Sequence, residues 1–220
     1  MPSSSLSPTV RDARADFFSA NDFGDGGYDD AYAEASFGPL TYRVPNPPAR
    51  ADALKLHDLH HVLTGYGTDW RGEAEISAWE VGSGFDAPPW ARMIMLWGMF
   101  TGLMLAPVDT VRAFLRGRRS SNLYTRRYDE ALLSRELADL EAELGVVPAD
   151  ADPWSGVSDR ERLADVVSLG GWLAASLGYG ALGLVPSLSL VAFAWVKAVG
   201  QALHWVRCPM GCPMTAARGA

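Results

Sequence analysis

The sequence predicts an all-α protein with a compact multi-helix core and a hydrophobic helical hairpin toward its C-terminus. Apolar residues recur at helical spacing through most of the region between residues 49 and 144, and we find neither convincing strands of period two nor an internal repeat. The chain has 220 residues, 48% hydrophobic and 20% charged, which is ordinary for a globular protein. We therefore expect one domain, or one domain with an appendage, that buries a sizeable core.

Residues 1–38 form an acidic leader that we expect to be partly flexible. Its run NDFGDGGYDD (21–30) is rich in Asp and Gly, but it lacks the alternating ligands and the closing Glu of a calcium-binding loop. A solvated acidic loop is the simpler interpretation. The Pro-rich stretch 44–48 separates the leader from the helices that follow.

Residues 39–147 are assigned to a helical core. Apolar periodicity predicts its first helix over 49–64. Asp69 is a suitable N-cap for a second helix over about 70–82, because a short acidic side chain can accept a hydrogen bond from the first free backbone N–H groups.

The second half of the core has its own start and stop signals. Pro88 and Pro89 open a longer apolar helix that breaks near Pro107, and a further helix carries VRAFLRGRR. The segment 122–144 is strongly amphipathic and predicts one more helix, which Gly145 ends.

Residues 148–207 are predicted to form a hydrophobic helical extension, followed by a flexible tail at 208–220. Residues 166–196 carry no formal charge, and 166–185 would be long enough to span a bilayer. A buried or interfacial hairpin, insertion into a membrane surface and a true span all stay open. At the end of the extension and in the tail, His204, Cys208 and Cys212 could hold Cu(I) or complete a zinc site, or could simply be reactive groups on a mobile end.

Charge and cysteine content exclude several classes of protein. The net charge of −7 argues against a protein that binds nucleic acid by neutralising phosphates. Two cysteines cannot build a disulfide framework, and the first thirty residues hold no apolar signal segment, so we expect a cytoplasmic protein. An arginine cluster within 112–127 suits anionic lipid headgroups or a substrate carboxylate, or forms a solvated face paired with acidic neighbours. Its members are Arg112, Arg116, Arg118, Arg119, Arg126 and Arg127.

Three histidines lie within five residues of one another. His57 and His61 are four apart, so one helix face projects both and could offer two nitrogen ligands to one metal ion. Asp58 is a third ligand or a group that orients an imidazole, and Glu73 on the next helix could face the same ion. His60 is also a helix neighbour of His57, and histidines at this spacing often only cap a polar face.

Two imidazoles with one or two carboxylates suit Zn²⁺, Fe²⁺, Co²⁺ or Mn²⁺ and leave positions open for water or substrate. Zinc is the ion we expect first. Asp58 stands where the HExxH metalloproteases have their catalytic Glu, which weakens that assignment. Glu75 and Glu80 are candidates for moving protons, or are solvated surface residues.

His57-Asp58-x-x-His61, eleven residues and Glu73 match the HDxxH-x11-E motif of the coenzyme Q biosynthesis protein 4 family. The surrounding HVLTGYGTDWRGEAE resembles its bacterial members, and NLYTRRYDEALLSRELADLEAELGV (122–146) resembles a second family segment. The resemblance covers roughly residues 40–147. It implies an all-helical protein of ubiquinone biosynthesis that holds a divalent metal through His57, Asp58, His61 and Glu73.

The resemblance also implies an activity. The family is credited with removing the ring C1 carboxylate of a polyprenyl hydroxybenzoate and replacing it with hydroxyl, which would make this chain a 4-hydroxy-3-methoxy-5-polyprenylbenzoate decarboxylase-like lyase. On this hypothesis Glu73 and Asp58 take part in catalysis. The four methionines within 93–106 would line a channel for the lipid tail, or pack in the core.

The alternative is a non-catalytic, lipid-binding scaffold that organises other ubiquinone biosynthesis proteins. Both hypotheses give the protein a polyprenylated aromatic ligand and a peripheral position on the inner membrane. Neither gives it a nucleic-acid partner, and a homodimer is compatible with both.

Overall fold

The computed structural model describes residues 7–37 and 40–182, and it is mostly helical, as the sequence predicts. Residues 159–182 are helical as well. The other elements are α1 (Val10–Ala20), β1 (Tyr32–Phe37), β2 (Leu40–Pro45), α2 (Pro48–Thr64), α3 (Trp70–Ser83), α4 (Pro89–Leu105), α5 (Pro107–Gly117), α6 (Glu130–Leu133) and α7 (Leu137–Leu144). The predicted boundaries of α2 to α4 are confirmed to within a few residues, and α5 is the further helix predicted after Pro107.

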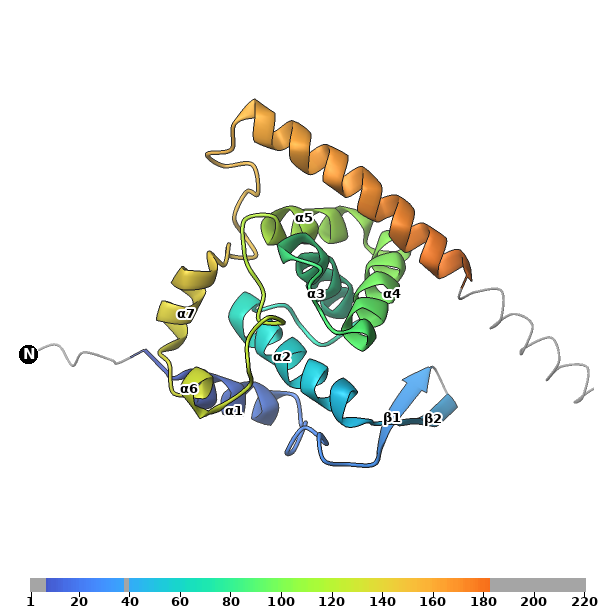
Figure 1. Ribbon diagram of the computed structural model, residues 1–220, viewed down its shortest axis with the longest axis vertical. Helices are drawn as coiled ribbons and strands as arrows, with labels where there is room; N and C mark the ends of the chain where they lie inside the picture. Colours follow the sequence, from blue (N-terminus) through green and yellow to red (C-terminus); the bar gives the residue numbers. More distant parts are fainter. Residues whose placement is uncertain (1–6, 38–39, 183–220) are drawn as a thin grey trace, which may run out of the picture. The chain divides into compact units, whose positions relative to one another are not determined.

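Helix α3 is the centre of the core, and Figure 1 shows it flanked by α2, α4 and α5. Its closest neighbour is α5, because glycines stand where the two backbones meet. A Cβ on Gly82 would overlap the carbonyl oxygen of Phe114, and a Cβ on Gly117 would overlap that of Trp79. The side chains of Trp79 and Phe114 are fully buried at this crossing.

The predicted single helix over 122–144 is wrong. Residues 122–129 are not helical, and α6 and α7 are separated at Ser134–Glu136. The break has a tertiary cause: the backbone of Arg135 accepts a hydrogen bond from Val10 N–H (2.9 Å), and Leu137 N–H donates to Pro8 (2.9 Å). The N-terminal segment thus pairs with residues that amphipathic periodicity assigns to a helix.

The leader contains elements that the sequence analysis does not predict. Helix α1 begins with a capping box in which the side chains of Thr9 and Asp12 satisfy each other's backbone N–H groups. Strands β1 and β2 form an antiparallel hairpin, which contradicts the absence of strands expected above. Residues 40–44 (LTYRV) do alternate apolar and polar side chains, but 32–37 (YAEASF) do not, so only one strand of the hairpin carries the signal.

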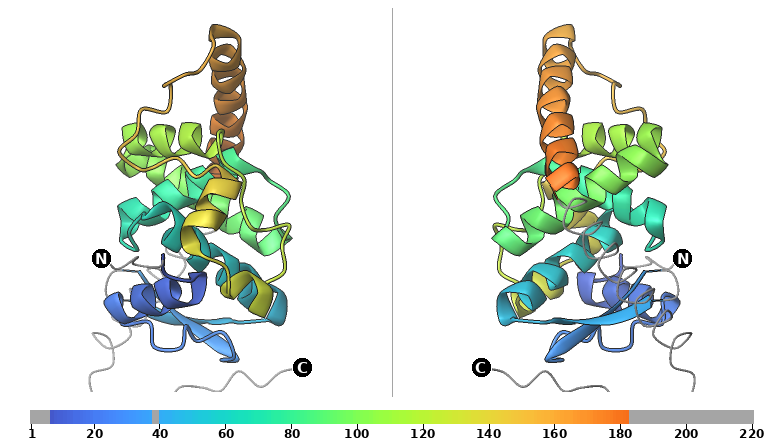
Figure 2. Two further views of the ribbon diagram at one scale, coloured as in Figure 1. Left: turned by 90° about the vertical axis from the view of Figure 1, so that its left-hand side faces the viewer. Right: turned by 90° about the vertical axis from the view of Figure 1, so that its right-hand side faces the viewer.

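The helix at 159–182 packs on the core through one face. Asp165 is buried and bonds the guanidinium groups of Arg118 and Arg119, and Trp172 lies against Phe85 at 4.5 Å between ring centres. Figure 2 shows this helix and the β1–β2 hairpin at opposite ends.

Contacts divide the chain into Met1–Gly180 and Ala181–Ala220, and only residues 181 and 182 of the second unit are described. The part of the predicted hairpin from residue 183 on therefore lies outside the described residues, as does the tail with Cys208 and Cys212. Within the described part of the chain, no helix is both long and apolar enough to cross a membrane.

Candidate metal centre

The turn between α2 and α3 brings the predicted ligands together. Gly65 ends α2 with a positive φ of 73°, a left-handed conformation that suits glycine. Asp69 caps α3 as predicted, because its side chain accepts a hydrogen bond from Gly72 N–H (2.8 Å). Gly72 approaches the backbone of Gly67 so closely that a Cβ would not fit. The tight turn places Glu73, in the first turn of α3, opposite α2.

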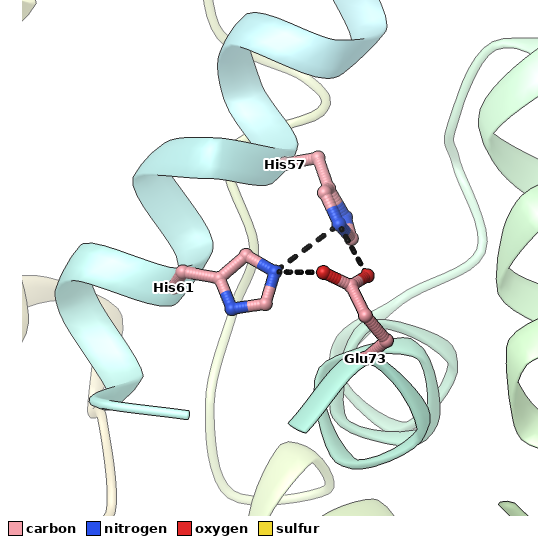
Figure 3. Close-up of side chains that lie close together, drawn as sticks. All are labelled: His57, His61 and Glu73. Carbon is pink, nitrogen blue, oxygen red and sulfur yellow. Dashed lines mark hydrogen bonds and ion pairs between the residues drawn. The ribbon is translucent and has the colours of Figure 1, made fainter. Parts of the chain in front are cut away.

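His57, His61 and Glu73 converge on one point. The Nε2 atoms of the two histidines are 3.3 Å apart, and the carboxylate oxygens of Glu73 lie 3.4 Å from His57 Nε2 and 3.5 Å from His61 Nε2. Both imidazoles project from α2 toward the carboxylate (Figure 3). Both histidines are buried, whereas the Glu73 side chain is 43% exposed. The site is thus walled by protein on the histidine side and open beside Glu73.

The other nitrogen of each histidine is already bonded. His61 Nδ1 lies 3.0 Å from the carbonyl oxygen of Tyr66, so it donates its proton there. His57 Nδ1 lies 2.9 Å from Glu80 Oε1. With Nδ1 acting as the donor in both rings, each Nε2 is the atom that can offer a lone pair to an ion. The ring of Phe17, on α1, stacks on His61 and covers its outer face.

These donors fit a divalent ion. Two ligands at the usual zinc distances, about 2.0–2.2 Å, lie about 3.4 Å apart in a tetrahedral site. The 3.3 Å between the two Nε2 atoms agrees with that spacing, and each histidine has one oxygen of Glu73 near it, Oε2 at 3.4 Å from His57 and Oε1 at 3.5 Å from His61. The potential ligand atoms of His57, His61 and Glu73 all lie within 4.8 Å of one another. The group could therefore hold one metal ion and leave positions for other ligands.

Charges around the site favour ionised carboxylates and a protonated His57 in the metal-free protein. Burial raises the pKa of Glu73, but hydrogen bonds and charges from His57 and His61 outweigh it and bring the pKa to about 2. Burial lowers the pKa of His57, yet the charge of Glu80 and the bond to Glu73 raise it well above 6.5. The site thus holds a proton where an ion would bind.

His60 belongs to a different layer. Its Nδ1 lies 2.6 Å from Glu80 Oε1, and its Nε2 accepts a hydrogen bond from Leu123 N–H (2.9 Å). Both ring nitrogens are engaged and the side chain is fully buried, so His60 has no lone pair for an ion. Burial lowers its pKa, which keeps the ring neutral.

Glu80 is fully buried, which rules out the solvated surface position considered above. Its Oε1 receives hydrogen bonds from His57, His60 and the hydroxyl of Tyr124 (2.8 Å). Burial raises the pKa of Glu80, but the charge and hydrogen bonds of the two histidines hold it well below its usual range. The available signal in the sequence is the spacing of seven from Glu73, two helical turns along the same face.

Asp58 does not join the group of three. Its Oδ2 accepts a hydrogen bond from the hydroxyl of Tyr28 at 2.5 Å. Burial raises the pKa of Asp58, which the bond to Tyr28 and the charges of His57 and His61 oppose. Asp58 is therefore near enough to act electrostatically on the site, and its role as a ligand stays a prediction.

The other residues singled out in the sequence, the methionines of α4 and Glu75, lie in different environments. Met95 and Met99 are fully buried in the core, whereas Met93 and Met104 are exposed. The Glu75 side chain is 16% exposed and lies beside Arg71, and it is not part of the group formed by His57, His61 and Glu73.

Much of the arginine cluster is paired internally. Arg116 is buried and donates to the hydroxyl of Tyr66 (3.3 Å), and Arg126 bonds Glu143. Arg118 and Arg119 bond Asp165, as described above.

A small cavity adjoins the site between α3 and α4. Its volume is about 190 Å³, and Glu73 forms part of its wall together with Trp70, Ser77, Trp97 and Thr101. The exposed side of the Glu73 carboxylate thus borders a hollow with two indole rings. A flat apolar group could approach the ion position from there.

A comparison of the chain with protein-family models, with curated proteins and with solved structures found no match in any of the three. The fold and the site by themselves therefore define the class: a helical protein with a buried two-histidine, one-carboxylate group that could hold a divalent ion.

Proposed function

We propose that the protein is a metal-dependent enzyme of ubiquinone biosynthesis that removes the ring C1 carboxylate of a polyprenyl hydroxybenzoate. In the net two-electron oxidation the carboxylate leaves as carbon dioxide, water supplies the hydroxyl that takes its place, and dioxygen accepts the two electrons and leaves as hydrogen peroxide. The observation that carries the proposal is the convergence of His57, His61 and Glu73, each histidine held by a hydrogen bond at its other nitrogen. The class of substrate is taken from the resemblance of the HDxxH-x11-E motif to the coenzyme Q biosynthesis protein 4 family.

When bound, a divalent ion supplies a Lewis acid for the ring carboxylate or phenolate. Residues of the chain would hold the ion, border the approach of the ring and move a proton. His57, His61 and Glu73 hold the ion, with zinc the first candidate and Fe²⁺, Co²⁺ and Mn²⁺ the alternatives. The indole rings of Trp70 and Trp97 border the approach and suit an aromatic ring. Asp58, hydrogen-bonded to Tyr28, is the candidate for moving a proton.

Exposed apolar side chains favour a second candidate function, a lipid-binding scaffold that presents the prenylated intermediate to other biosynthetic proteins. Met104, Leu105 and Val108, where α4 meets α5, are all more than half exposed. Such a patch suits apolar contact with a membrane surface, and the proposal places the protein on the cytoplasmic side of the inner membrane. Binding of anionic liposomes that is weakened by salt and reversed by carbonate would support this attachment.

The decisive experiment follows carbon dioxide released from a ring-carboxyl-labelled polyprenyl hydroxybenzoate by the purified protein, with air and each of the four ions. Glu73→Gln keeps the volume and an oxygen donor but removes a charge, so release should fall by orders of magnitude. Glu75→Gln, the same change two residues later and about 200° round the helix from Glu73, is the control and should leave release unchanged.

If the wild type releases nothing under any of these conditions, the catalytic proposal loses its support. If Glu73→Gln restores ubiquinone in a deficient bacterium as well as the wild type does, the ion is not catalytic and the scaffold function is favoured.

A further inference from the structure

Glu80 sits behind the candidate metal centre. It lies two turns beyond Glu73 on α3, it is fully buried, and its Oε1 collects hydrogen bonds from His57, His60 and Tyr124. A buried carboxylate is costly unless its charge is compensated, so this arrangement needs a reason. Stabilising the fold alone would be served as well if Glu80 and its polar partners were together replaced by apolar side chains of similar volume.

Two of the donors, His57 and His60, lie on α2 and the third, Tyr124, lies beyond α5, and the donors are themselves held in place. His60 cannot turn, because its second nitrogen accepts the Leu123 N–H. The segment that carries Leu123 and Tyr124 is fixed by Asn122, whose side chain donates to the carbonyl oxygen of Gly84 (2.8 Å) just beyond the end of α3. Together these bonds leave the Glu80 carboxylate one orientation, with Oε1 aimed at His57.

We infer that Glu80 is a positioning residue of the metal centre: it holds the Nδ1–H of His57 so that Nε2 faces Glu73 and His61. A carboxylate behind a ligating imidazole makes that ligand more basic, and loss of such a partner typically costs 10–100-fold in metal affinity. The buried negative charge also offsets the charge of a bound dication together with Glu73. His60 and the Asn122–Tyr124 segment then serve to aim Glu80. This inference rests on the proposed function only in taking His57 as a ligand.

The first test measures the affinity of the purified protein for Zn²⁺ and Co²⁺ against a competing chelator. Glu80→Gln keeps the volume and one acceptor oxygen but removes the charge, and we expect it to bind each ion 10–100-fold more weakly while keeping its helical content. Glu75→Gln is the matched control on the same helix and should stay within about twofold of the wild type. Wild-type affinity in Glu80→Gln would overturn the inference.

The second test needs no metal. In protein labelled with ¹⁵N at histidine, the Nδ1–H of His57 should give a downfield signal that exchanges slowly with water. In Glu80→Leu, which has no acceptor, that signal should be lost or should exchange rapidly. A wild-type His57 without a proton on Nδ1 would contradict the inference, and should Glu80→Leu fail to fold, the wild-type signal and Glu80→Gln still decide it.

The two proposals fail in different ways. A wild-type protein that binds neither ion would overturn the metal-dependent function, whereas the His57 signal would still report whether Glu80 holds the ring. If Glu80→Gln binds metal as tightly as the wild type does, the metal-dependent function still stands, but Glu80 has no role in positioning His57.

Discussion

Glu73 and Glu80 are the same residue type on one helix, two turns apart, yet they lie in opposite environments. Glu73 belongs to the open half of α3 (residues 70–77), where its side chain is 43% exposed beside a cavity. Glu80 belongs to the sealed half (residues 78–83) and is 0% exposed. The chemical role of each carboxylate therefore depends on the hydrogen-bond donors that surround it. Glu73 faces the Nε2 atoms of His57 and His61, which an ion would bind, whereas Glu80 accepts three hydrogen bonds.

Packing explains why the two halves differ. The sealed half crosses α5 at Gly82 with no room for a Cβ, and the segment around Tyr124 covers its remaining side. In the open half, α4 approaches at Gly98 and Gly102, whose absent side chains leave space for Ser77 and Ala74, and the cavity lies beside these two contacts. The same helix thus anchors the core and opens the site.

The largest effect is expected from the open half. His61→Ala removes one of three ligands, and we expect the affinity for Zn²⁺ to fall by about a thousandfold, equal to about 4 kcal/mol, with little loss of helical content. Elemental analysis of gently purified protein and chelator competition would measure this. Full metal occupancy in His61→Ala would show that the ion binds elsewhere.

The counterpart in the sealed half should affect stability instead. His60→Ala leaves the Leu123 N–H without an acceptor and opens a cavity beside Trp79, so we expect the free energy of unfolding to fall by about 3 kcal/mol. Denaturant unfolding of the metal-free protein would measure it. If unfolding is unchanged but metal is lost, His60 is a ligand and the division into two layers is wrong.

The pH dependence of metal binding tests how the two halves are coupled through His57. Burial lowers the pKa of His57, but Glu80 and Glu73 raise it well above 6.5, so the metal-free imidazole keeps its proton at neutral pH. Binding must displace that proton. Metal affinity should therefore fall as pH drops, by up to about tenfold per pH unit below the pKa of His57, and level off above it. Titrations at several pH values would show this, and a flat profile across neutral pH would contradict it.

The smallest effect is expected at the outer surface of the open half. Arg71 pairs with Asp109 (2.9 Å), but its side chain is 61% exposed. Arg71→Ala should therefore cost only about 0.5 kcal/mol of stability, and less in high salt. Metal affinity should not change. A strong loss of affinity would mean that surface charge, rather than the buried partners of the histidines, governs the site.

Part of the candidate site can be predicted from the sequence because it depends on local geometry. The spacing of His57 and His61 puts both rings on one face of any helix, and Asp69 predicts the start of α3. Glu73 follows within the first turn of that helix, so its approach to the histidines needs only a tight connection. The roles of His60 and Glu80 cannot be predicted in this way, since their partners at Leu123 and Tyr124 are more than forty residues away.

Capping, proline position and apolar periodicity act within a few turns of chain, so the helical class, the boundaries of α2 to α4, the presence of α5 and the pair of histidines can be predicted without the structure. The separation of α6 from α7, in contrast, depends on tertiary contacts, because Val10 N–H in the N-terminal segment donates a hydrogen bond to the carbonyl oxygen of Arg135. Tertiary contacts also decide which glutamate is open and which is sealed. Burial is a property of what packs on a side chain, and here the covering groups come from distant parts of the sequence.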